Sequence, residues 1–251
     1  MAKNSKDTIH IGTSGWNYKH WQKAWYPEKI KTNNFLNYYA DHFQTVEVNN
    51  TFYNLPSKKV IKSWRKKVPK EFIFSVKASR YITHMKKLKN PKESLKRFFS
   101  RVNLLNNNLG PILFQLPPNW YKNIERLNNF VNLLPKKKQI AIEFRDQSWW
   151  RDDVYNLLKK NNIAFCLYQL AGIKTPRKIT ADFAYIRLHG PSDKPYQGNY
   201  HGNSLRAWAS YFKKIKKEKR VKEIYCYFDN DEKGYAPKNA KQMIKYSNKV
   251  R

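Results

Sequence analysis

With 251 residues and a mass of 30.1 kDa, of which 41% are hydrophobic and 16% aromatic, the chain is too long for a minimal domain and too apolar to be disordered. It contains no run of about 18 apolar residues, which excludes a membrane-spanning helix. The formal net charge is +32, from 50 Lys and Arg against 18 Asp and Glu, and it favours polyanionic partners.

Short runs of alternating hydrophobicity and longer runs of helical spacing follow one another through the whole chain. We predict eight strands, over residues 8–13, 45–48, 72–78, 112–116, 140–145, 163–167, 183–188 and 223–228. The predicted helices lie near 34–43, after Ser57, near 91–106, near 123–134, after Ser148, near 204–219 and near 237–247. Ser57 and Ser148 are the expected N-caps, and Pro91 suits a first helical turn.

Alternating strands and helices imply a parallel sheet. No GxGxxG or GxxxxGK[ST] loop of an open nucleotide-binding sheet occurs, and the length matches one closed barrel. The sequence therefore predicts a TIM (β/α)8-type parallel barrel within the α/β class, formed by a single domain over residues 1–251. Gly172 and Pro176 leave little room between strands six and seven, so we expect that helix to be reduced or missing.

The strongest functional signal is the pattern of polar residues within these strands. In the run 140–145, Ala141, Glu143 and Arg145 share one face because successive side chains of a strand point to opposite sides. The other strands likewise have one apolar face and a second face that turns polar near the carboxyl end. Barrel enzymes act at that end, so we expect these polar side chains to gather at one rim.

The candidate residues fall into three predicted roles. The catalytic candidates are Glu47, Lys77, Glu143, His189 and Asp229. The substrate-binding candidates are Ser14, Trp16, Asn49, Tyr53, Gln115, Arg145, Arg187 and Asn230. Glu47, Glu143, His189 and Asp229 are also candidate ligands for a divalent metal (Mg, Mn or Zn), although no tight ligand motif supports that site.

Several functions remain open from these residues. The leading hypothesis is a hydrolase-type enzyme, assisted by a metal in one version, that acts on a phosphorylated or nucleotide-like substrate. A glycoside-type hydrolase using Glu47 and Glu143 as a carboxylate pair is one alternative. A non-catalytic protein that binds a small anion or nucleic acid is another, and a merely structural network of paired charges is the least specific.

The basic charge has a competing explanation in composition. Only 12 of the 50 basic residues are Arg, and the 38 Lys are dispersed, as AT-rich coding would produce, with small runs at 136–138 and 213–220. We therefore expect weak nonspecific binding of nucleic acid rather than a dedicated surface. We predict a cytoplasmic protein without a membrane partner, because the start over residues 1–7 is polar. The two isolated cysteines, Cys166 and Cys226, are expected to be buried and reduced. The sequence does not determine the oligomeric state.

Ordered motifs along nearly the whole chain resemble the YecE-like family, also called domain of unknown function 72. They are GTSGW at 12–16, TVEVN at 45–49, TFY at 51–53, FSVKA at 74–78, GPILFQLPP at 110–118, EFR at 143–145, RLHG at 187–190, YFDND at 227–231 and NA at 239–240. The resemblance implies a TIM-barrel fold but no agreed activity. Asp146 stands where many members have His, and Tyr168–Gln169 where many have Asp, while the catalytic candidates above are unaffected.

Overall fold

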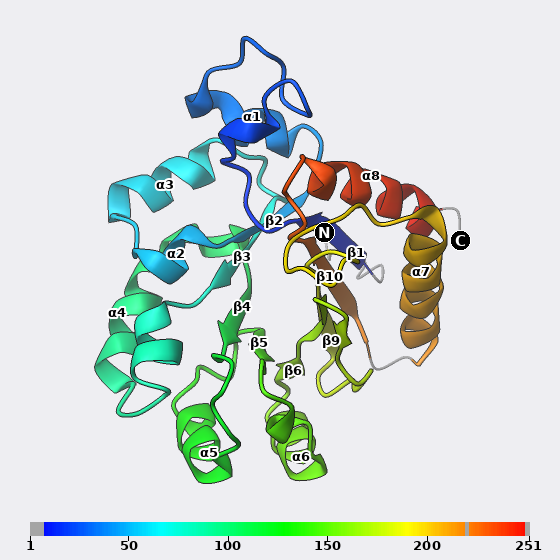
Figure 1. Cartoon of the computed structure of the whole chain (residues 1–251). Helices are drawn as coiled ribbons and strands as arrows, with labels where there is room; N and C mark the ends of the chain where they lie inside the picture. The colour runs from blue at the N-terminus through cyan, green and yellow to red at the C-terminus, as the bar shows by residue number, and fades with distance from the viewer. Residues whose placement is uncertain (1–7, 219–220, 249–251) are drawn as a thin grey trace. The chain divides into compact units, whose positions relative to one another are not determined.

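Strands and helices alternate along the chain (Figure 1). The structure is a computed structural model, and it describes residues 8–218 and 221–248. The predicted polar start over residues 1–7, and the residues Lys219 and Arg220 at the end of a predicted helix and lysine run, lie outside the described residues. The chain divides into two compact units. Unit 1 comprises the residues up to Val46, Leu167–Arg177 and those from Asp182 on, and unit 2 comprises Glu47–Cys166 and Lys178–Ala181.

The strands of unit 1 form a five-stranded sheet in the order β1-β10-β9-β7-β8. Its elements are β1 (Thr8–Thr13), α1 (Phe35–Ala40), β7 (Leu167–Leu170), β8 (Ile173–Lys174), β9 (Phe183–Leu188), α7 (Gly202–Lys217), β10 (Glu223–Phe228) and α8 (Tyr235–Asn248), with 3-10 turns at Lys19–Trp21 and Thr32–Asn34. β1, β10, β9 and β7 run parallel, and only β8 is antiparallel to its neighbour β7. The helices α7 and α8 pack side by side, and α8 covers β1 and β10 (Figure 1).

A second sheet has the order β2-β3-β4-β5-β6, and apart from the start of β2 it lies in unit 2. Its strands are β2 (Thr45–Val48), β3 (Ile73–Lys77), β4 (Leu109–Gln115), β5 (Ile140–Glu143) and β6 (Ala164–Phe165). The helices are α2 (Asn50–Tyr53), α3 (Lys58–Lys66), α4 (Lys92–Val102), α5 (Ile124–Asn132) and α6 (Asp152–Lys160), with a π-helix at Tyr81–Met85 and 3-10 turns at Asn103–Asn108 and Gln147–Trp149.

Aromatic contacts show which face of the second sheet the helices cover. Phe114 of β4 contacts Phe98 of α4 and Phe130 of α5, at centroid distances of 6.3 and 5.0 Å. On β3, Phe74 stacks against Trp64 of α3. Phe74 and Phe114 belong to the apolar faces that strand alternation predicts. All five side chains are buried, because a parallel sheet under helices has little solvent contact.

The fold class predicted from the sequence is confirmed: parallel strands alternate with helices in an α/β fold of the TIM-barrel type. The ladders within the described ranges form two sheets, so they do not close a ring. The connector after strand six holds the β7–β8 hairpin in place of a helix, as expected. None of the helices in the described part of the chain combines the length and hydropathy that a bilayer crossing requires.

Two local predictions were wrong or incomplete. Ser57 caps α3 by accepting from the Val60 amide, but α6 begins after Arg151 and not after Ser148. Asp146 captures the Ser148 amide first and nucleates a 3-10 turn, and the Ser148 hydroxyl accepts from the Lys122 amide instead. Predicted strand six is divided at Cys166 into β6 and β7, which belong to different sheets.

Candidate functional site

The predicted site residues fall into two groups, one in each compact unit. Unit 1 holds Ser14, Trp16, Arg187, His189, Asp229 and Asn230, and unit 2 holds Glu47, Asn49, Tyr53, Lys77, Gln115, Glu143 and Arg145. The expectation that both groups share one rim stays a prediction.

The ladder of the first sheet aligns the candidates of unit 1 along its carboxyl edge. Thr13, Phe228, Leu188 and Gln169 are partners in successive strands, so the residues that follow them come to the same level. Three amides complete this row: Ser14 donates to Phe228, Asp229 donates to Leu188, and His189 donates to Gln169. The parallel register thus brings residues separated by more than 200 positions in the sequence to the same edge of the sheet.

Arg187, His189 and Asp229 form a buried hydrogen-bonded network at this edge. His189 Nδ1 lies 2.8 Å from Asp229 Oδ2, and Nδ1 is the donor because a carboxylate only accepts. Arg187 donates to the same oxygen at 3.2 Å, and its second terminal nitrogen lies 3.4 Å from His189 Nε2. The exposed fractions of the three side chains are 1% for Arg187, 0% for His189 and 12% for Asp229. This network therefore orients the imidazole and leaves Nε2 as its basic nitrogen.

Asn230 extends the network into the next loop. Its side-chain amide donates to the Gly198 carbonyl and to Asn239 Oδ1, while its own Oδ1 is buried without a hydrogen-bond partner among the described residues. Asn239 Oδ1 also accepts from the Tyr200 amide, and the Tyr200 hydroxyl accepts from the Gly190 amide. A buried acceptor without a partner costs stability, which makes this oxygen a candidate ligand contact.

The loop 190–200 covers the imidazole. Tyr196 packs edge-on against His189 with a centroid distance of 5.5 Å, although 44% of Tyr196 is exposed. Gly190 has φ +112°, and a Cβ there would lie 2.1 Å from the Gln197 carbonyl oxygen. The loop can close only with glycine at this position. Sequence reasoning did not single out Tyr196, because its contact with His189 depends on this turn.

A second acid of unit 1, Asp231, has an altered affinity for protons. Burial and the nearby charge of Asp229 raise the pKa of Asp231 to about 6, and His20 opposes them. His20 Nε2 lies 3.5 Å from Asp231 Oδ2. Asp231 therefore gains a proton in weakly acidic solution, unlike an ordinary surface carboxylate.

In unit 2, three candidates share the face of the sheet opposite to α4 and α5. Gln115 pairs with Glu143 across β4 and β5, and Lys77 pairs with Leu113, so all three alternate with the helix-facing Phe114. Each is the last residue of its strand. The predicted placement of Glu143 away from the helix-facing side is thus confirmed within this sheet.

Glu143 lies at the centre of a charged cluster in unit 2. It is fully buried and accepts a hydrogen bond from Arg145 Nε, and the Cys166 thiol lies 3.8 Å from its other oxygen. Lys77 Nζ lies 4.0 Å from the centroid of the Phe52 ring, which also contacts His84. Buried charges need such partners, so part of this cluster serves the fold.

His84 is the functional candidate that sequence reasoning missed in unit 2. Burial, reinforced by the positive charges of Lys77 and Arg145, lowers the pKa of His84 to about 4. Its ring is therefore neutral at pH 7, in a cationic environment. The residue lies in the π-helix, whose irregular geometry has no hydrophobic period, and only its spacing of seven residues from Lys77 could have drawn attention to it.

The remaining candidates differ in accessibility. Glu47 is fully buried in β2, Asn49 is half-buried with its Oδ1 lacking a hydrogen-bond partner within the described ranges, and Trp16 is half-exposed. Tyr53 is 61% exposed, whereas Trp21 of the aromatic loop 14–31 is fully buried. Rings of that loop pack against one another and against α1, as Trp21 does with Trp25 and Tyr26 with Phe35, and Trp16 and Tyr53 remain predicted contact residues.

The predicted metal ligands do not form a cluster of donors within the described ranges. Within residues 8–218 and 221–248, no group of three or more His, Cys, Asp and Glu side chains is placed to hold a metal ion. The four predicted ligands are divided two and two between the units, and Asp229 and Glu143 already accept hydrogen bonds from arginines.

Comparisons with known proteins place the chain among uncharacterised relatives. The model of the family described as "Protein of unknown function DUF72" matches residues 10–251. The UPF0759 protein YunF of Bacillus subtilis is 26% identical over 94% of this chain and 93% of its own length, and the UPF0759 protein YecE of Escherichia coli is 28% identical over 55% and 48%. The crystal structure of a DUF72 family protein (TM1631) from Thermotoga maritima superposes with a TM-score of 0.84 at 30% identity, covering 95% and 98% of the two chains.

Proposed function

The chain belongs to the DUF72 family, and we propose that it is a hydrolase-type enzyme acting on a phosphorylated or nucleotide-like substrate at the Arg187–His189–Asp229 network. The observation that carries this proposal is the hydrogen bond of 2.8 Å between His189 Nδ1 and Asp229 Oδ2 in a buried setting. A carboxylate that holds one imidazole nitrogen fixes the tautomer and strengthens the other nitrogen as a base.

Arg187 supplies the group that would recognise the anion. Its guanidinium already lies between Asp229 and His189 Nε2, so a phosphoryl oxygen bound to it would lie beside the basic nitrogen. Asn230 adds an amide oxygen without a partner in the described ranges, suited to a hydroxyl or amino group of the substrate.

The proposed step is general-base hydrolysis. His189 Nε2 takes a proton from water, the water oxygen bonds to phosphorus, and the bond from phosphorus to the leaving oxygen breaks. The imidazolium, stabilised by Asp229, returns the proton to the leaving oxygen. The products are a free alcohol and the phosphate.

The substrate would reach His189 when the loop 190–200 opens. His189 is fully buried beneath Tyr196, and Gly190 and Gly198 with positive φ stand near the two ends of the loop. Closure of such a loop over a bound substrate separates the reacting centre, with its attacking water, from bulk solvent.

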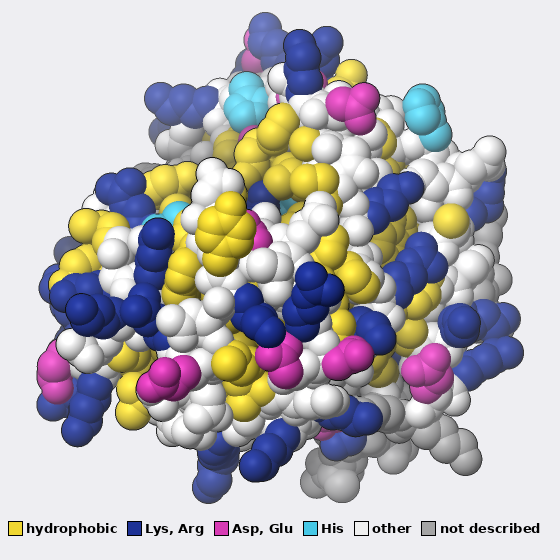
Figure 2. All heavy atoms as spheres, turned by 60° about the horizontal axis from the view of Figure 1, so that its bottom comes forward, with side chains coloured by type: hydrophobic (Ala, Val, Ile, Leu, Met, Phe, Trp, Pro, Cys, Tyr) yellow, Lys and Arg dark blue, Asp and Glu magenta, His cyan; other side chains and the backbone are white. Residues whose placement is uncertain are grey.

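The alternatives have less support. The pairing of Glu143 with Arg145 weakens the carboxylate-pair glycosidase hypothesis, because that carboxylate is already neutralised. Nonspecific binding of nucleic acid fits the surface in Figure 2, where Lys and Arg outnumber Asp and Glu but stand apart among hydrophobic and uncharged side chains. Such dispersed charge predicts weak binding that salt abolishes.

The experiment is a phosphate-release screen of the purified protein. Its substrates are p-nitrophenyl phosphate, bis-p-nitrophenyl phosphate and the nucleoside monophosphates. We expect turnover of at least one substrate, and a loss of roughly 100-fold or more in kcat for His189→Gln, since general-base catalysis contributes about 10²–10⁴-fold.

The matched control is His201→Gln, which removes an exposed imidazole at the start of α7 and should keep full activity. Equal activity of His189→Gln and the wild type would contradict the proposed role. Tight binding of the same phosphates without any turnover would instead favour the non-catalytic anion-binding alternative.

A further inference from the structure

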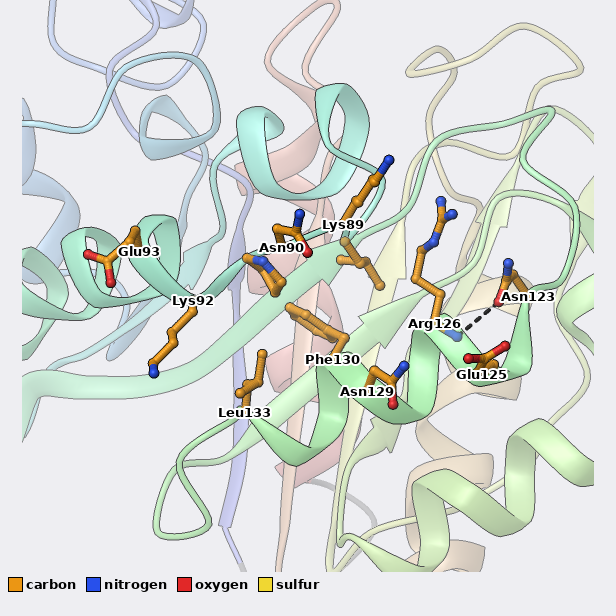
Figure 3. A pocket seen from close by; sticks show the side chains of 12 residues that line it. Lys89, Asn90, Lys92, Glu93, Asn123, Glu125, Arg126, Asn129, Phe130 and Leu133 are labelled. Atoms are coloured by element: carbon orange, nitrogen blue, oxygen red, sulfur yellow. Dashed lines mark hydrogen bonds between the residues drawn. The ribbon is translucent and has the colours of Figure 1, made fainter.

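Two surface grooves in unit 2 lie on either side of the segment that follows β3. The first has a volume of about 530 Å³ and is lined by Tyr53, Tyr81, Lys86 and Arg97 among others. The second, of about 560 Å³, lies between this segment and α5 (Figure 3). Both volumes are within the range of ligand sites, and Asn90 and Glu93 line both grooves. The two grooves therefore adjoin at Asn90 and Glu93, and together they are called the track.

The first groove presents two aromatic rings to solvent. Tyr53 is 61% exposed and Tyr81 is 45% exposed. Each ring has a cation over it: the Arg80 guanidinium lies 5.7 Å from the Tyr53 centroid, and Lys86 Nζ lies 5.6 Å from that of Tyr81. A ring held by a cation but open to solvent is a platform for stacking.

The charge along the track is positive. Lys86 and Arg97 line the first groove, and Lys89, Lys92 and Arg126 line the second, against the two carboxylates Glu93 and Glu125. Lys89 and Arg126 point in the same direction from opposite sides of the second groove (Figure 3). Elsewhere the lysines of this chain are dispersed, so the combination of cations with open aromatic rings distinguishes this track.

The backbone between the grooves is unusually constrained. Lys87, Leu88 and Asn90 all have positive φ, of 44°, 62° and 46°. The buried Leu88 side chain anchors the turn, and the Leu88 amide donates to the Ile82 carbonyl at 3.0 Å. Such conformations are strained for residues other than glycine and concentrate at functional sites. The preceding π-helix, Tyr81–Met85, is a second irregularity of the same kind.

We propose that this track binds single-stranded nucleic acid, with bases stacked on Tyr53 and Tyr81 and phosphates paired with Lys86 and Arg97. Stacking requires unpaired bases, so the track would prefer a single strand to a duplex. The constrained turn fixes the backbone between Lys86, which lines the first groove, and Lys89, which lines the second. The proposal is independent of the phosphate chemistry proposed above, because it uses none of Arg187, His189 and Asp229.

Fluorescence anisotropy with labelled dT12 and rU12 tests the proposal. We expect the Kd to rise roughly 5- to 150-fold for Tyr53→Ala and for Tyr81→Ala, the range that base–aromatic stacking supplies. Lys86→Gln and Arg97→Gln should each lower the slope of log K against log salt by about 0.7, as for one lost phosphate contact of a single strand.

The matched control is Tyr121→Ala, because Tyr121 is 74% exposed and lines neither groove. It should bind dT12 as the wild type does, and so should His189→Gln, whose defect is confined to hydrolysis. The proposal fails if the Tyr53 and Tyr81 variants, shown to be folded by circular dichroism, bind like the wild type. It fails equally if a 12-base-pair duplex binds as tightly as dT12, or if the wild type binds neither oligonucleotide.

Discussion

The ion pair between Arg187 and Asp229 predicts a large coupling that a double-mutant cycle can measure. Both side chains are nearly inaccessible to solvent, with exposed fractions of 1% and 12%, and the donor–acceptor distance is 3.2 Å. Removing one member of a buried pair typically costs about 3–5 kcal/mol because the remaining charge keeps its desolvation penalty. Asp229→Asn and Arg187→Met should each lower the unfolding free energy by that amount.

The double variant should recover part of this loss, because neither charge is then left behind. We expect the two single effects to exceed the double effect by about 2 kcal/mol, within the range for directly contacting residues. For a chain of this size, each single variant should lower Tm by roughly 6–20 °C. The assay is urea denaturation at pH 7.5, monitored by circular dichroism, with the m-value compared across the four proteins.

The surface pair of Lys122 and Asp153 provides the control. Its N–O distance is 2.7 Å, shorter than that of the buried pair, but the two side chains are 32% and 45% exposed. Asp153→Asn should therefore cost less than about 1 kcal/mol. If the Arg187 and Asp229 effects add within about 0.5 kcal/mol, the two side chains are not energetically coupled and the reasoning is refuted.

Four further predictions concern pH, the covering loop and metals. Folding raises the pKa of Asp231 from 3.8 to about 6, so the ionised carboxylate destabilises the fold fully above pH 6, and this destabilisation is relieved as the pH falls towards 3.8. Asp231→Asn should therefore be more stable than the wild type at pH 7.5 but not at pH 4. An equal difference in stability at both pH values would contradict this. His84 has the opposite sign: its pKa falls from 6.5 to about 4, so stability should drop as the pH is lowered through that window, and a wild-type pH profile in His84→Gln would refute this cause. Gly190→Ala should displace the loop 190–200 and lower the unfolding free energy by more than about 1 kcal/mol, whereas the control Gly202→Ala in α7 should not. A wild-type denaturation midpoint for Gly190→Ala would be inconsistent with the clash at Gln197. Dialysis against EDTA should leave any phosphate release intact, and a loss that Mn²⁺ or Zn²⁺ restores would return the metal-assisted hypothesis to first place.

The elements set by local pattern were predictable from the sequence. Strand alternation alone placed Glu143 and Gln115 each on the polar face of its own strand, because the parity of side chains within a strand needs no tertiary information. The same reasoning placed Arg187 in β9 and His189 and Asp229 at the ends of β9 and β10. It could not show that these three residues bond to one another, because that depends on the register between strands.

What the sequence could not reveal depends on irregular backbone and on competition between caps. The π-helix that carries His84 and the positive-φ turn at Leu88 have no hydrophobic period to detect. Ser148 has the chemistry of an N-cap, but Asp146 captures its amide first. Tyr196 covers His189 only because Gly190 allows the loop to turn back.

A crystal structure with orthovanadate, a mimic of the phosphoryl group, tests the central claim most directly. The account predicts vanadium density within hydrogen-bond reach of the Arg187 guanidinium and His189 Nε2, with His189 Nδ1 still bonded to Asp229 and the loop 190–200 displaced or closed over the anion. Vanadium bound only elsewhere, or absent at saturating concentration while Arg187 keeps its pairing with Asp229, would contradict the account.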